Sequence, residues 1–220
     1  MEPRALILPS FASTCGVNDI FRNIWTGLAA ATPLDQINLL LGVTGVWLMI
    51  RRSLWAFPVG LVAVTVQGVL FFRTRIYADA VLQVFFFVTL AWGWWHWVKP
   101  GGKAQELPVT KLGARGRVIV VVTASITTVV WALALRRWTD AVIPWRDAFI
   151  AAFSVVAQVL QARKQVETWP LWVVVNLVAI PAYWSASLAY SAFLYLIYLG
   201  LALAGWRAWH RASKSVPAYG

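Results

Sequence analysis

The stretch ADAVLQVFFFVTLAWGWWHWV, residues 78–98, decides the fold class of this chain. Apart from Asp79 near its start, the stretch carries no Asp, Glu, Lys or Arg, and it ends in a cluster of tryptophans. A helix of about 20 apolar residues crosses the roughly 30 Å hydrocarbon core of a bilayer. Tryptophan is enriched at the membrane–water interface. The stretch therefore predicts a transmembrane helix.

Six further apolar segments lie on either side of this stretch. They are residues 34–50, 54–72, 118–135, 148–160, 169–184 and 188–206. Charged residues make up 12% of the 220 residues and hydrophobic residues 60%, whereas a soluble domain carries about 25% charged residues. We therefore expect an all-α membrane protein with about seven transmembrane helices.

The two ends of the chain differ from this apolar core. Residues 1–33 lack the basic start and continuous apolar run of a signal peptide, and we expect an interfacial or disordered segment there. Residues 210–220 are expected to form a cytoplasmic tail. Cys15 is the single cysteine, which excludes an internal disulfide and a multi-cysteine metal site.

The basic residues predict the orientation of the chain. Its net charge is +11, but Lys and Arg cluster between the apolar segments rather than on one face. That pattern is typical of membrane loops and does not indicate nucleic-acid binding. With seven spans, twelve of the nineteen basic residues lie on the side of the C-terminus. The positive-inside rule then predicts a cytoplasmic C-terminus and an outer N-terminus.

An internal repeat appears when the chain is shifted against itself by 112 residues. The informative matches are Arg51 with Arg163, Pro58 with Pro170, Gly93 with Gly205, Trp94 with Trp206 and Trp97 with Trp209. Each repeat would contain three helices, at residues 34–98 and 148–209, with a spacer helix at 118–135 between them. This 3+1+3 order predicts parallel repeats related by an axis along the membrane normal.

Motifs of catalysis and of ion coupling are sparse. The chain has no GxxxxGK[ST], HExxH or GxSxG motif, and its two histidines, His96 and His210, stand at predicted helix ends. Asp79 is the best candidate for ion coupling, with a helix-start role as the alternative. Asp35, Asp147 and Glu167 can likewise sit at helix ends. We therefore expect no catalytic residue, no metal and no cofactor.

The run WPLWVVVN, residues 169–176, carries the clearest candidate binding site. Trp169, Trp172 and Asn176 are spaced i, i+3, i+7 and share one helix face, with Tyr183 two turns further. An amide in mid-membrane must find a polar partner. We interpret this face as a slot in which an aromatic ring stacks on indole while Asn176 forms a hydrogen bond. The alternative is that the tryptophans are interfacial and Asn176 bonds another helix.

Other uncharged polar residues could complete a central cavity. Gln83 and Tyr195 lie 112 residues apart, in the third helix of each predicted repeat. We interpret this pair as opposite walls of one cavity, with helix–helix hydrogen bonding as the alternative. Further polar residues in the predicted helices are Gln67, Ser154, Gln158 and Gln161. Of these, Gln158 is included in the predicted substrate site.

Five runs of the sequence resemble the PnuC family of bacterial vitamin transporters. They are WLMIRRSLWAFPVG (47–60), FFRTRIYADAVLQVFFF (71–87), GWWHW (93–97), ARKQVETWPLWVVVN (162–176) and LYLIYL (194–199). The resemblance covers roughly residues 34–209. It implies a 3+1+3 fold like that of SWEET sugar transporters, in a bacterial inner membrane. It also implies substrate binding midway through the membrane by Trp169, Trp172 and Asn176, with Gln83 nearby.

The same resemblance implies a function. Family members take up nicotinamide riboside by facilitated diffusion, and a cytoplasmic kinase traps the substrate by phosphorylation. Nicotinamide riboside is therefore the first candidate, and thiamine, riboflavin and deoxynucleosides are alternatives. Some members carry Asn where this chain has Ala63 and Val64. The run LWAFPVG is similar to the riboflavin-transporting branch, in which an Asp replaces the Asn of WPxWxxxN.

Two other classes of function stay open at this point. A membrane enzyme would need converging titratable groups, which this sequence lacks. A non-transporting subunit would not need polar residues at matching depth in both repeats. The expected partners are a small vitamin or nucleoside, membrane lipid and the cytoplasmic kinase. Association with further copies of the chain stays open.

Overall fold

The computed structural model describes residues 32–73, 77–98, 107–139, 143–185 and 189–214, together with residues 22, 25, 26 and 29. The side chains of residues 77–79, 189 and 190 lie outside this description. Most of the predicted N-terminal segment, Cys15, the side chain of Asp79 and residues 215–220 of the predicted tail therefore lie outside the described residues.

Seven helices occupy the described part of the chain. They are α2 (Pro33–Ile50), α3 (Ala56–Arg73), α4 (Tyr77–Val98), α5 (Ala114–Trp138), α6 (Pro144–Ala162), α7 (Thr168–Ser185) and α8 (Ala189–Ala212). Each predicted apolar segment is thus a helix, and the all-α class is confirmed. The largest differences are at α5, α6 and α8, which extend several residues beyond the apolar stretch. Their flanks carry Arg and Trp, whose long side chains reach the interface while the helix continues.

Two of the helices begin at recognisable caps. Thr32 and Asp35 form a capping box before α2, with the Asp35 N–H 3.3 Å from Thr32 Oγ1 and the Thr32 N–H 2.9 Å from Asp35 Oδ2. Pro144 begins α6, and Asp147 lies in its first turn beside Arg146. Both carboxylates therefore sit at helix starts, as predicted.

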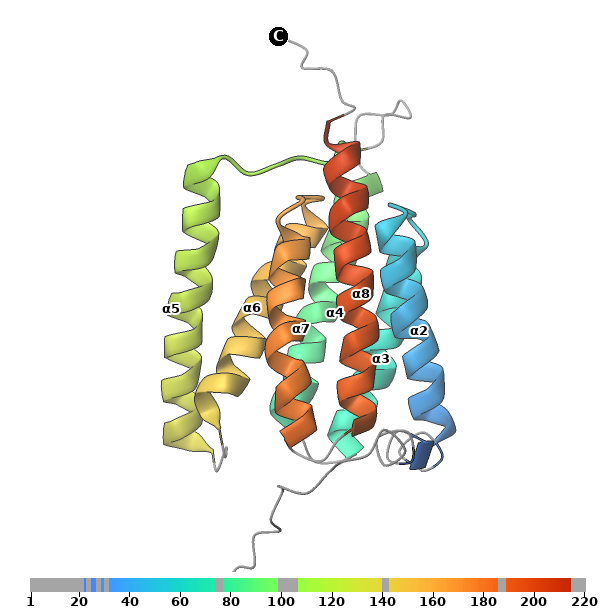
Figure 1. Ribbon diagram of the computed structural model, residues 1–220, viewed down its shortest axis with the longest axis vertical. Coiled ribbons are helices and arrows are strands. Elements are labelled where there is room, and N and C mark those ends of the chain that lie inside the picture. The colour runs from blue at the N-terminus through green and yellow to red at the C-terminus, as the bar shows by residue number, and fades with distance from the viewer. Residues whose placement is uncertain are drawn as a thin grey trace, which may run out of the picture.

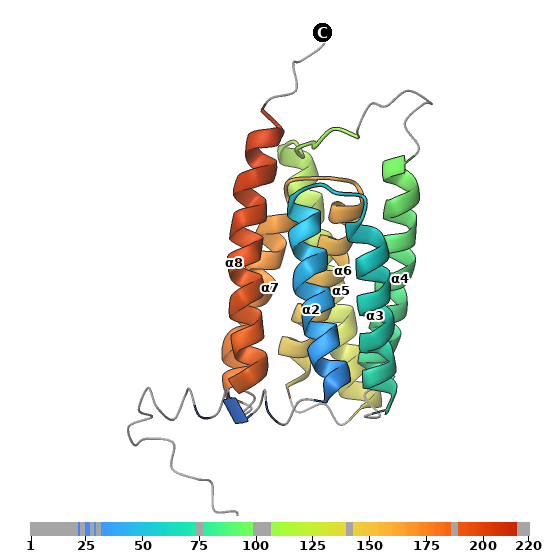
Figure 2. The ribbon, with the colours of Figure 1, turned by 90° about the vertical axis from the view of Figure 1, so that its right-hand side faces the viewer.

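Six of the helices form a closed ring. Around the ring, α2 packs on α3, α3 on α4, α4 on α6, α6 on α7, α7 on α8, and α8 returns to α2. The helices run lengthwise beside one another, and α5 lies at the outer edge of the bundle next to α6 (Figure 1). The last turns of α4 and α8 lie at the same end of the bundle (Figure 2). The ring leaves a central space between helices that are far apart in sequence.

Five of these helices are long and apolar enough to cross a membrane: α2, α3, α4, α5 and α8. The chain is therefore a multi-pass membrane protein. The other two, α6 and α7, are long enough, at 19 and 18 residues, but they are not apolar enough within the described residues. They carry the largest sets of buried residues, which include the polar Ser154, Gln158 and Asn176. Polar groups shielded by neighbouring helices lower the hydropathy of a helix without exposing those groups to lipid.

The α2–α3 and α6–α7 turns share one backbone conformation. Arg52 and Lys164, 112 residues apart, have φ of 59° and 58°, both in the left-handed region. The next residue in each turn donates its backbone N–H to a carbonyl five residues earlier in the helix. Ser53 donates to Leu48 and Gln165 to Leu160, both at 3.0 Å. The offset seen in the sequence is thus matched by local geometry.

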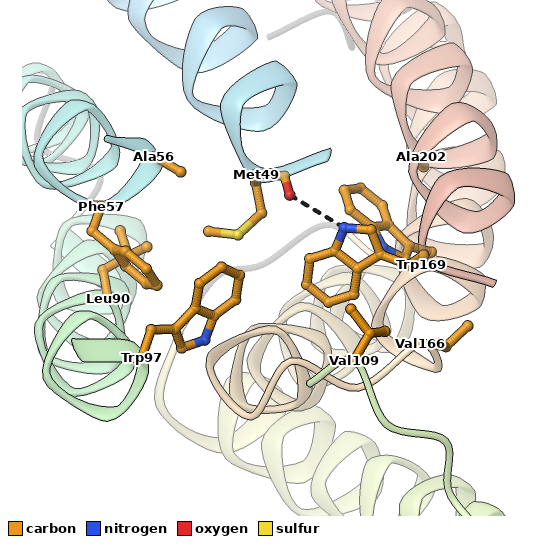
Figure 3. Close-up of a cluster of buried hydrophobic side chains, with 10 residues drawn as sticks. Met49, Ala56, Phe57, Leu90, Trp97, Val109, Val166, Trp169 and Ala202 are labelled. Atoms are coloured by element: carbon orange, nitrogen blue, oxygen red, sulfur yellow. Dashed lines mark hydrogen bonds between the residues drawn. The ribbon is translucent and has the colours of Figure 1, made fainter. Parts of the chain in front are cut away.

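An aromatic residue after each turn packs edge-on against a tryptophan from the end of the bundle. The rings of Phe57 and Trp97 lie 5.0 Å apart at 84°, and those of Trp169 and Trp209 lie 5.4 Å apart at 87°. Figure 3 shows this buried cluster, with Met49 between the two aromatic groups. The cluster closes one end of the ring with apolar side chains.

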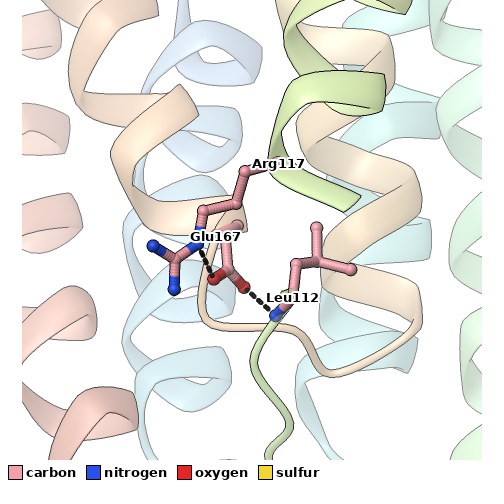
Figure 4. Close-up of polar contacts among 3 residues, drawn as sticks. All are labelled: Leu112, Arg117 and Glu167. Atoms are coloured by element: carbon pink, nitrogen blue, oxygen red, sulfur yellow. Dashed lines mark hydrogen bonds and ion pairs between the residues drawn. The ribbon is translucent and has the colours of Figure 1, made fainter. Parts of the chain in front are cut away.

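The segment before α5 is held against the α6–α7 turn. Glu167 accepts the Leu112 N–H at 3.1 Å and pairs with Arg117 at 3.3 Å (Figure 4). Thr110 also bridges to Gln165 through the backbone. Glu167 therefore lies just before the start of α7, and its carboxylate contacts the segment that leads into α5. This contact anchors the N-terminal end of α5, which otherwise packs on the outside of the ring.

Candidate substrate-binding site

A cavity of about 330 Å³ lies inside the helix ring. All six ring helices contribute to its wall, and α5 contributes none of the lining residues. The lining includes every residue of the predicted site: Gln83, Gln158, Trp169, Trp172, Asn176, Tyr183 and Tyr195. The structure therefore brings all seven to one place from four different helices.

The α7 face of the cavity is organised by its own hydrogen bonds. Trp172 donates its indole N–H to Gln161 Oε1 on α6 at 2.9 Å, which fixes the ring plane. Asn176 donates to the Trp172 carbonyl one turn earlier at 2.7 Å. Among the described residues, none donates to the Asn176 side-chain oxygen. This oxygen is a free acceptor at a position that is 3% exposed.

The interfacial alternative for this face does not fit Trp169. Its side chain is 2% exposed and packs against Trp209, so it lies in the interior of the ring. Its indole nitrogen is buried and has no hydrogen-bond partner in the described structure. Asn176 also bonds its own helix rather than a neighbouring one. Trp169 therefore does not face lipid, and the hydrogen bond of Asn176 stays within its own helix.

Tyrosines from α7 and α8 form a second aromatic surface. The rings of Tyr183 and Tyr195 stack at 4.9 Å, and Tyr198 meets Tyr195 edge-on at 6.2 Å. Sequence reasoning missed Tyr198, although its i, i+3 spacing from Tyr195 in LYLIYL was a usable signal. It also missed Gly42 on α2, where any Cβ atom would collide with the Tyr198 hydroxyl.

The wall contributed by α2, α3 and α4 is mostly small or apolar. Several lining pairs stand 112 residues apart: Val46 and Gln158, Met49 and Gln161, Gly60 and Trp172, Val64 and Asn176, Phe71 and Tyr183. In each pair the second member is the more polar or the more aromatic. The cavity thus has a polar, aromatic half on α6–α8 and an apolar half opposite, where Gln83 is the exception.

The described lining of the cavity carries no charge. None of the described residues that line it is Asp, Glu, Lys, Arg or His, and the side chain of Asp79 lies outside the description. The described part of the chain also contains no group of three His, Cys, Asp or Glu residues that could hold a metal ion. His96, at the end of α4, stacks on Trp92 at 5.6 Å. Such a cavity suits an uncharged ring, or a delocalised cation that rests on aromatic faces.

Comparison with known proteins identifies the family. The family model described as nicotinamide mononucleotide transporter matches residues 32–211, which span all seven helices. The chain belongs to this family, that of the PnuC vitamin transporters. The resemblance read from the five sequence runs is thereby confirmed.

Curated relatives of this PnuC-family chain carry different vitamins. It is 32% identical over 183 residues to the riboflavin/roseoflavin transporter RibM of Streptomyces davaonensis, covering 82% of this chain and 85% of that protein. It is 26% identical over 206 residues to the nicotinamide riboside transporter PnuC of Escherichia coli, covering 82% and 86%. Both relatives are transporters.

A solved structure supports the architecture. The crystal structure of the vitamin B3 transporter PnuC superposes with a TM-score of 0.71 at 20% identity, covering 89% of this chain and 90% of that one. At this identity the likeness bears on the fold alone. The helical bundle described here is therefore the PnuC fold.

Proposed function

We propose that this protein takes up nicotinamide riboside by facilitated diffusion and that the cavity inside the helix ring is its binding site. The observation that carries the proposal is the convergence of Trp169, Trp172 and Asn176 on one neutral, buried cavity. Gln83, Gln158, Tyr183 and Tyr195 complete the proposed site.

The chemistry of the lining matches a vitamin of this kind. Trp172 is held in one orientation by Gln161 and offers a face on which a heteroaromatic ring stacks. The free oxygen of Asn176 accepts a hydrogen bond from a ring carboxamide. The nicotinamide ring of the riboside is cationic, and indole and phenol faces stabilise a cation without a carboxylate.

We propose further that the ring is built from two parallel three-helix repeats, α2–α4 and α6–α8, with α5 as the spacer. The contact of α4 with α6 has its counterpart in the contact of α8 with α2, which supports an approximate two-fold axis. The matching turns at Arg52 and Lys164 support it too. In this arrangement α6 and α7 also cross the membrane, shielded by their neighbours, and the C-terminus is cytoplasmic in the bacterial inner membrane.

The described lining supports facilitated diffusion. A coupling ion would need an ionisable or multidentate oxygen site along the path, and none of the described residues that line the cavity is acidic or basic. Transport without coupling only equilibrates its substrate, so net uptake needs a sink. Phosphorylation by a cytoplasmic kinase would provide that sink, because a phosphorylated product carries charge that this neutral cavity does not stabilise.

Riboflavin is the second candidate substrate. It is favoured by the 32% identity to a riboflavin/roseoflavin transporter and by the neutral cavity, which suits an uncharged isoalloxazine ring. Thiamine and deoxynucleosides rest on the family resemblance alone.

Purified protein in liposomes tests the proposal. Binding of nicotinamide riboside, riboflavin, thiamine and deoxynucleosides should be measured, followed by uptake of the tightest ligand without ATP or an ion gradient. We expect uptake that stops when the inner and outer concentrations are equal. If none of these ligands binds, the proposed function is contradicted. If a ligand is cleaved, the protein is an enzyme. Accumulation driven by a proton gradient contradicts facilitated diffusion and returns attention to Asp79.

A further inference from the structure

The polar side chains along α6 are of two kinds: one already has a hydrogen-bond partner in the protein, and two are uncommitted, which means that they have none among the described residues. Ser154, Gln158 and Gln161 are spaced i, i+4, i+7 and all line the cavity. Gln161 already accepts the Trp172 N–H at 2.9 Å. Ser154 and Gln158 are 6% and 7% exposed, and neither forms a hydrogen bond within the described part of the chain. Two buried polar side chains therefore face the cavity without a protein partner.

The other buried hydroxyl groups among the described residues do not behave as Ser154 does. Thr168 donates to the Ala157 carbonyl at 2.8 Å. Thr89 and Thr128 donate to a backbone carbonyl four residues earlier in their helices, at 2.9 and 2.8 Å. This is the usual way for a helix to satisfy a hydroxyl group that lacks water. Ser154 leaves that bond unmade. Since nearly all buried polar groups are hydrogen-bonded, an uncommitted hydroxyl and amide that line the cavity are available to the polar groups of a ligand that enters it.

The opposite wall cannot serve the same purpose. Positions 112 residues before Ser154 and Gln158 are Gly42 and Val46, which also line the cavity. Every residue that α2 contributes to the lining is glycine or aliphatic, apart from the thioether of Met49. Between these two helices, only α6 therefore offers side chains that can form hydrogen bonds with hydroxyl groups of a ligand.

We propose that Ser154 and Gln158 form a subsite for the hydroxyl groups of a ribose or ribityl chain, and that Gln161 acts only by positioning Trp172. The inference rests on the proposed function and assigns the parts of its ligand. A serine hydroxyl both donates and accepts, and a glutamine amide offers two donors and an acceptor, which matches neighbouring alcohols. Residues at i and i+4 are about 5–6 Å apart at Cβ, a span that adjacent hydroxyl groups can bridge.

The positions along α6 fix the orientation of the ligand. Gln161, which holds the ring platform, lies one turn after Gln158, and Ser154 lies one turn before it. The heteroaromatic ring therefore lies toward Trp172, and the hydroxylated chain extends along α6 toward Ser154. The two halves of the vitamin are recognised by different residues, and substitutions should separate them.

The test compares ligands with and without hydroxyl groups. Affinities of the purified protein are measured for nicotinamide riboside against nicotinamide, and for riboflavin against lumiflavin. We expect Ser154→Ala and Gln158→Met to weaken the hydroxylated ligand roughly three- to tenfold each and to leave the free ring unchanged. Gln161→Met should weaken both members of a pair, because it releases Trp172. Gln67→Met is the matched control, since Gln67 bonds Asn38 and does not line the cavity.

Each outcome bears on the inference. Equal loss of both ligands in Gln158→Met, or no loss in either Ser154→Ala or Gln158→Met, overturns the subsite. A parent protein that binds ring and hydroxylated ligand equally well also overturns it. A parent protein that binds none of the four ligands contradicts the proposed function first. Ser154→Ala removes one oxygen from a helix and should fold normally, so it keeps the test informative should Gln158→Met be unstable.

Discussion

Trp97 and Trp209 make the same contact at two opposite seams of the helix ring. Trp97 on α4 donates its indole N–H to the carbonyl oxygen of Ala162 at the end of α6, at 2.9 Å. Trp209 on α8 donates to the Ile50 carbonyl at the end of α2 at 3.2 Å and to the Met49 carbonyl at 3.2 Å, and Figure 3 draws the second of these bonds. The Ala162 and Ile50 carbonyls lie in the last turn of their helices, where the usual backbone donor is missing, whereas the Met49 carbonyl also accepts the Arg52 N–H at 3.0 Å. Each tryptophan bond joins the two proposed repeats.

We predict that Trp97→Phe and Trp209→Phe destabilise the protein by similar amounts. Phenylalanine keeps an aromatic ring but removes the N–H, so each change should cost about 0.5–1.5 kcal/mol from the hydrogen bond, plus some lost packing. Thermal unfolding of the purified variants in detergent measures the effect.

Trp206→Phe on α8 is the control for this pair. Trp206 is 39% exposed and its N–H has no partner among the described residues, so its loss should leave the unfolding temperature unchanged. A shift for Trp206→Phe as large as for the other two would show that the N–H bonds are not the cause.

A second prediction compares two glycines of α8. A Cβ atom at Gly205 would come within 2.5 Å of three ring atoms of Trp169, whereas one at Gly200 would meet nothing within 4 Å. Gly205→Ala should therefore destabilise the protein by about 1–3 kcal/mol through overpacking. It should also weaken ligand binding, because Trp169 lines the cavity.

Gly200→Ala should be neutral or stabilising by up to about 1 kcal/mol, since alanine favours the helix. Unfolding and ligand affinity are measured for both variants. Equal behaviour of the two variants would contradict the close packing of α8 on Trp169.

Much of the fold was readable from the sequence because its signals are local. Apolar length, terminal tryptophans and basic loops depend only on neighbouring residues, and they gave all seven helices. The ends of α5 and α8 were missed because Arg117 and Arg207 looked like loop residues, although each continues a helix. The hydropathy of α6 and α7 is low for a different reason. Polar residues within these two helices face the cavity.

The sequence predicted residues that all line one cavity, but it did not predict the hydrogen bonds among them. The spacing of Trp169, Trp172 and Asn176 identified one helix face, and periodicity is sufficient for that. Which amides are free depends on residues from other helices. Gln161 is committed to Trp172 and Gln67 to Asn38, and neither pairing follows from sequence spacing.

A third prediction concerns topology. The ends of α4 and α8 lie at one end of the bundle (Figure 2), and twelve of the nineteen basic residues belong to that side. A reporter fused after Gly220 and one inserted between residues 99 and 106 should both report cytoplasm. Reporters on opposite sides of the membrane would contradict the arrangement of the helices, and two external reporters would contradict only the orientation.

The last prediction separates stacking from hydrogen bonding at the proposed site. Trp172→Ala removes the aromatic platform, worth about 1–3 kcal/mol if base stacking is the guide, so affinity should fall roughly five- to 150-fold. Trp172→Phe keeps a ring but loses the bond to Gln161, and its affinity should lie between those of the parent and the alanine variant.

Asn176→Leu removes the free acceptor and should cost about 1–3 kcal/mol if a ligand donor is left unpaired. Both sites are changed without adding a polar group to the membrane, so the variants should purify like the parent. Binding is measured for the tightest ligand found with the parent protein. Should well-folded Trp172→Ala and Asn176→Leu bind as tightly as the parent, α7 does not form the binding surface. The ligand would then have to lie against Gln83 and Tyr195, on the far side of the same cavity.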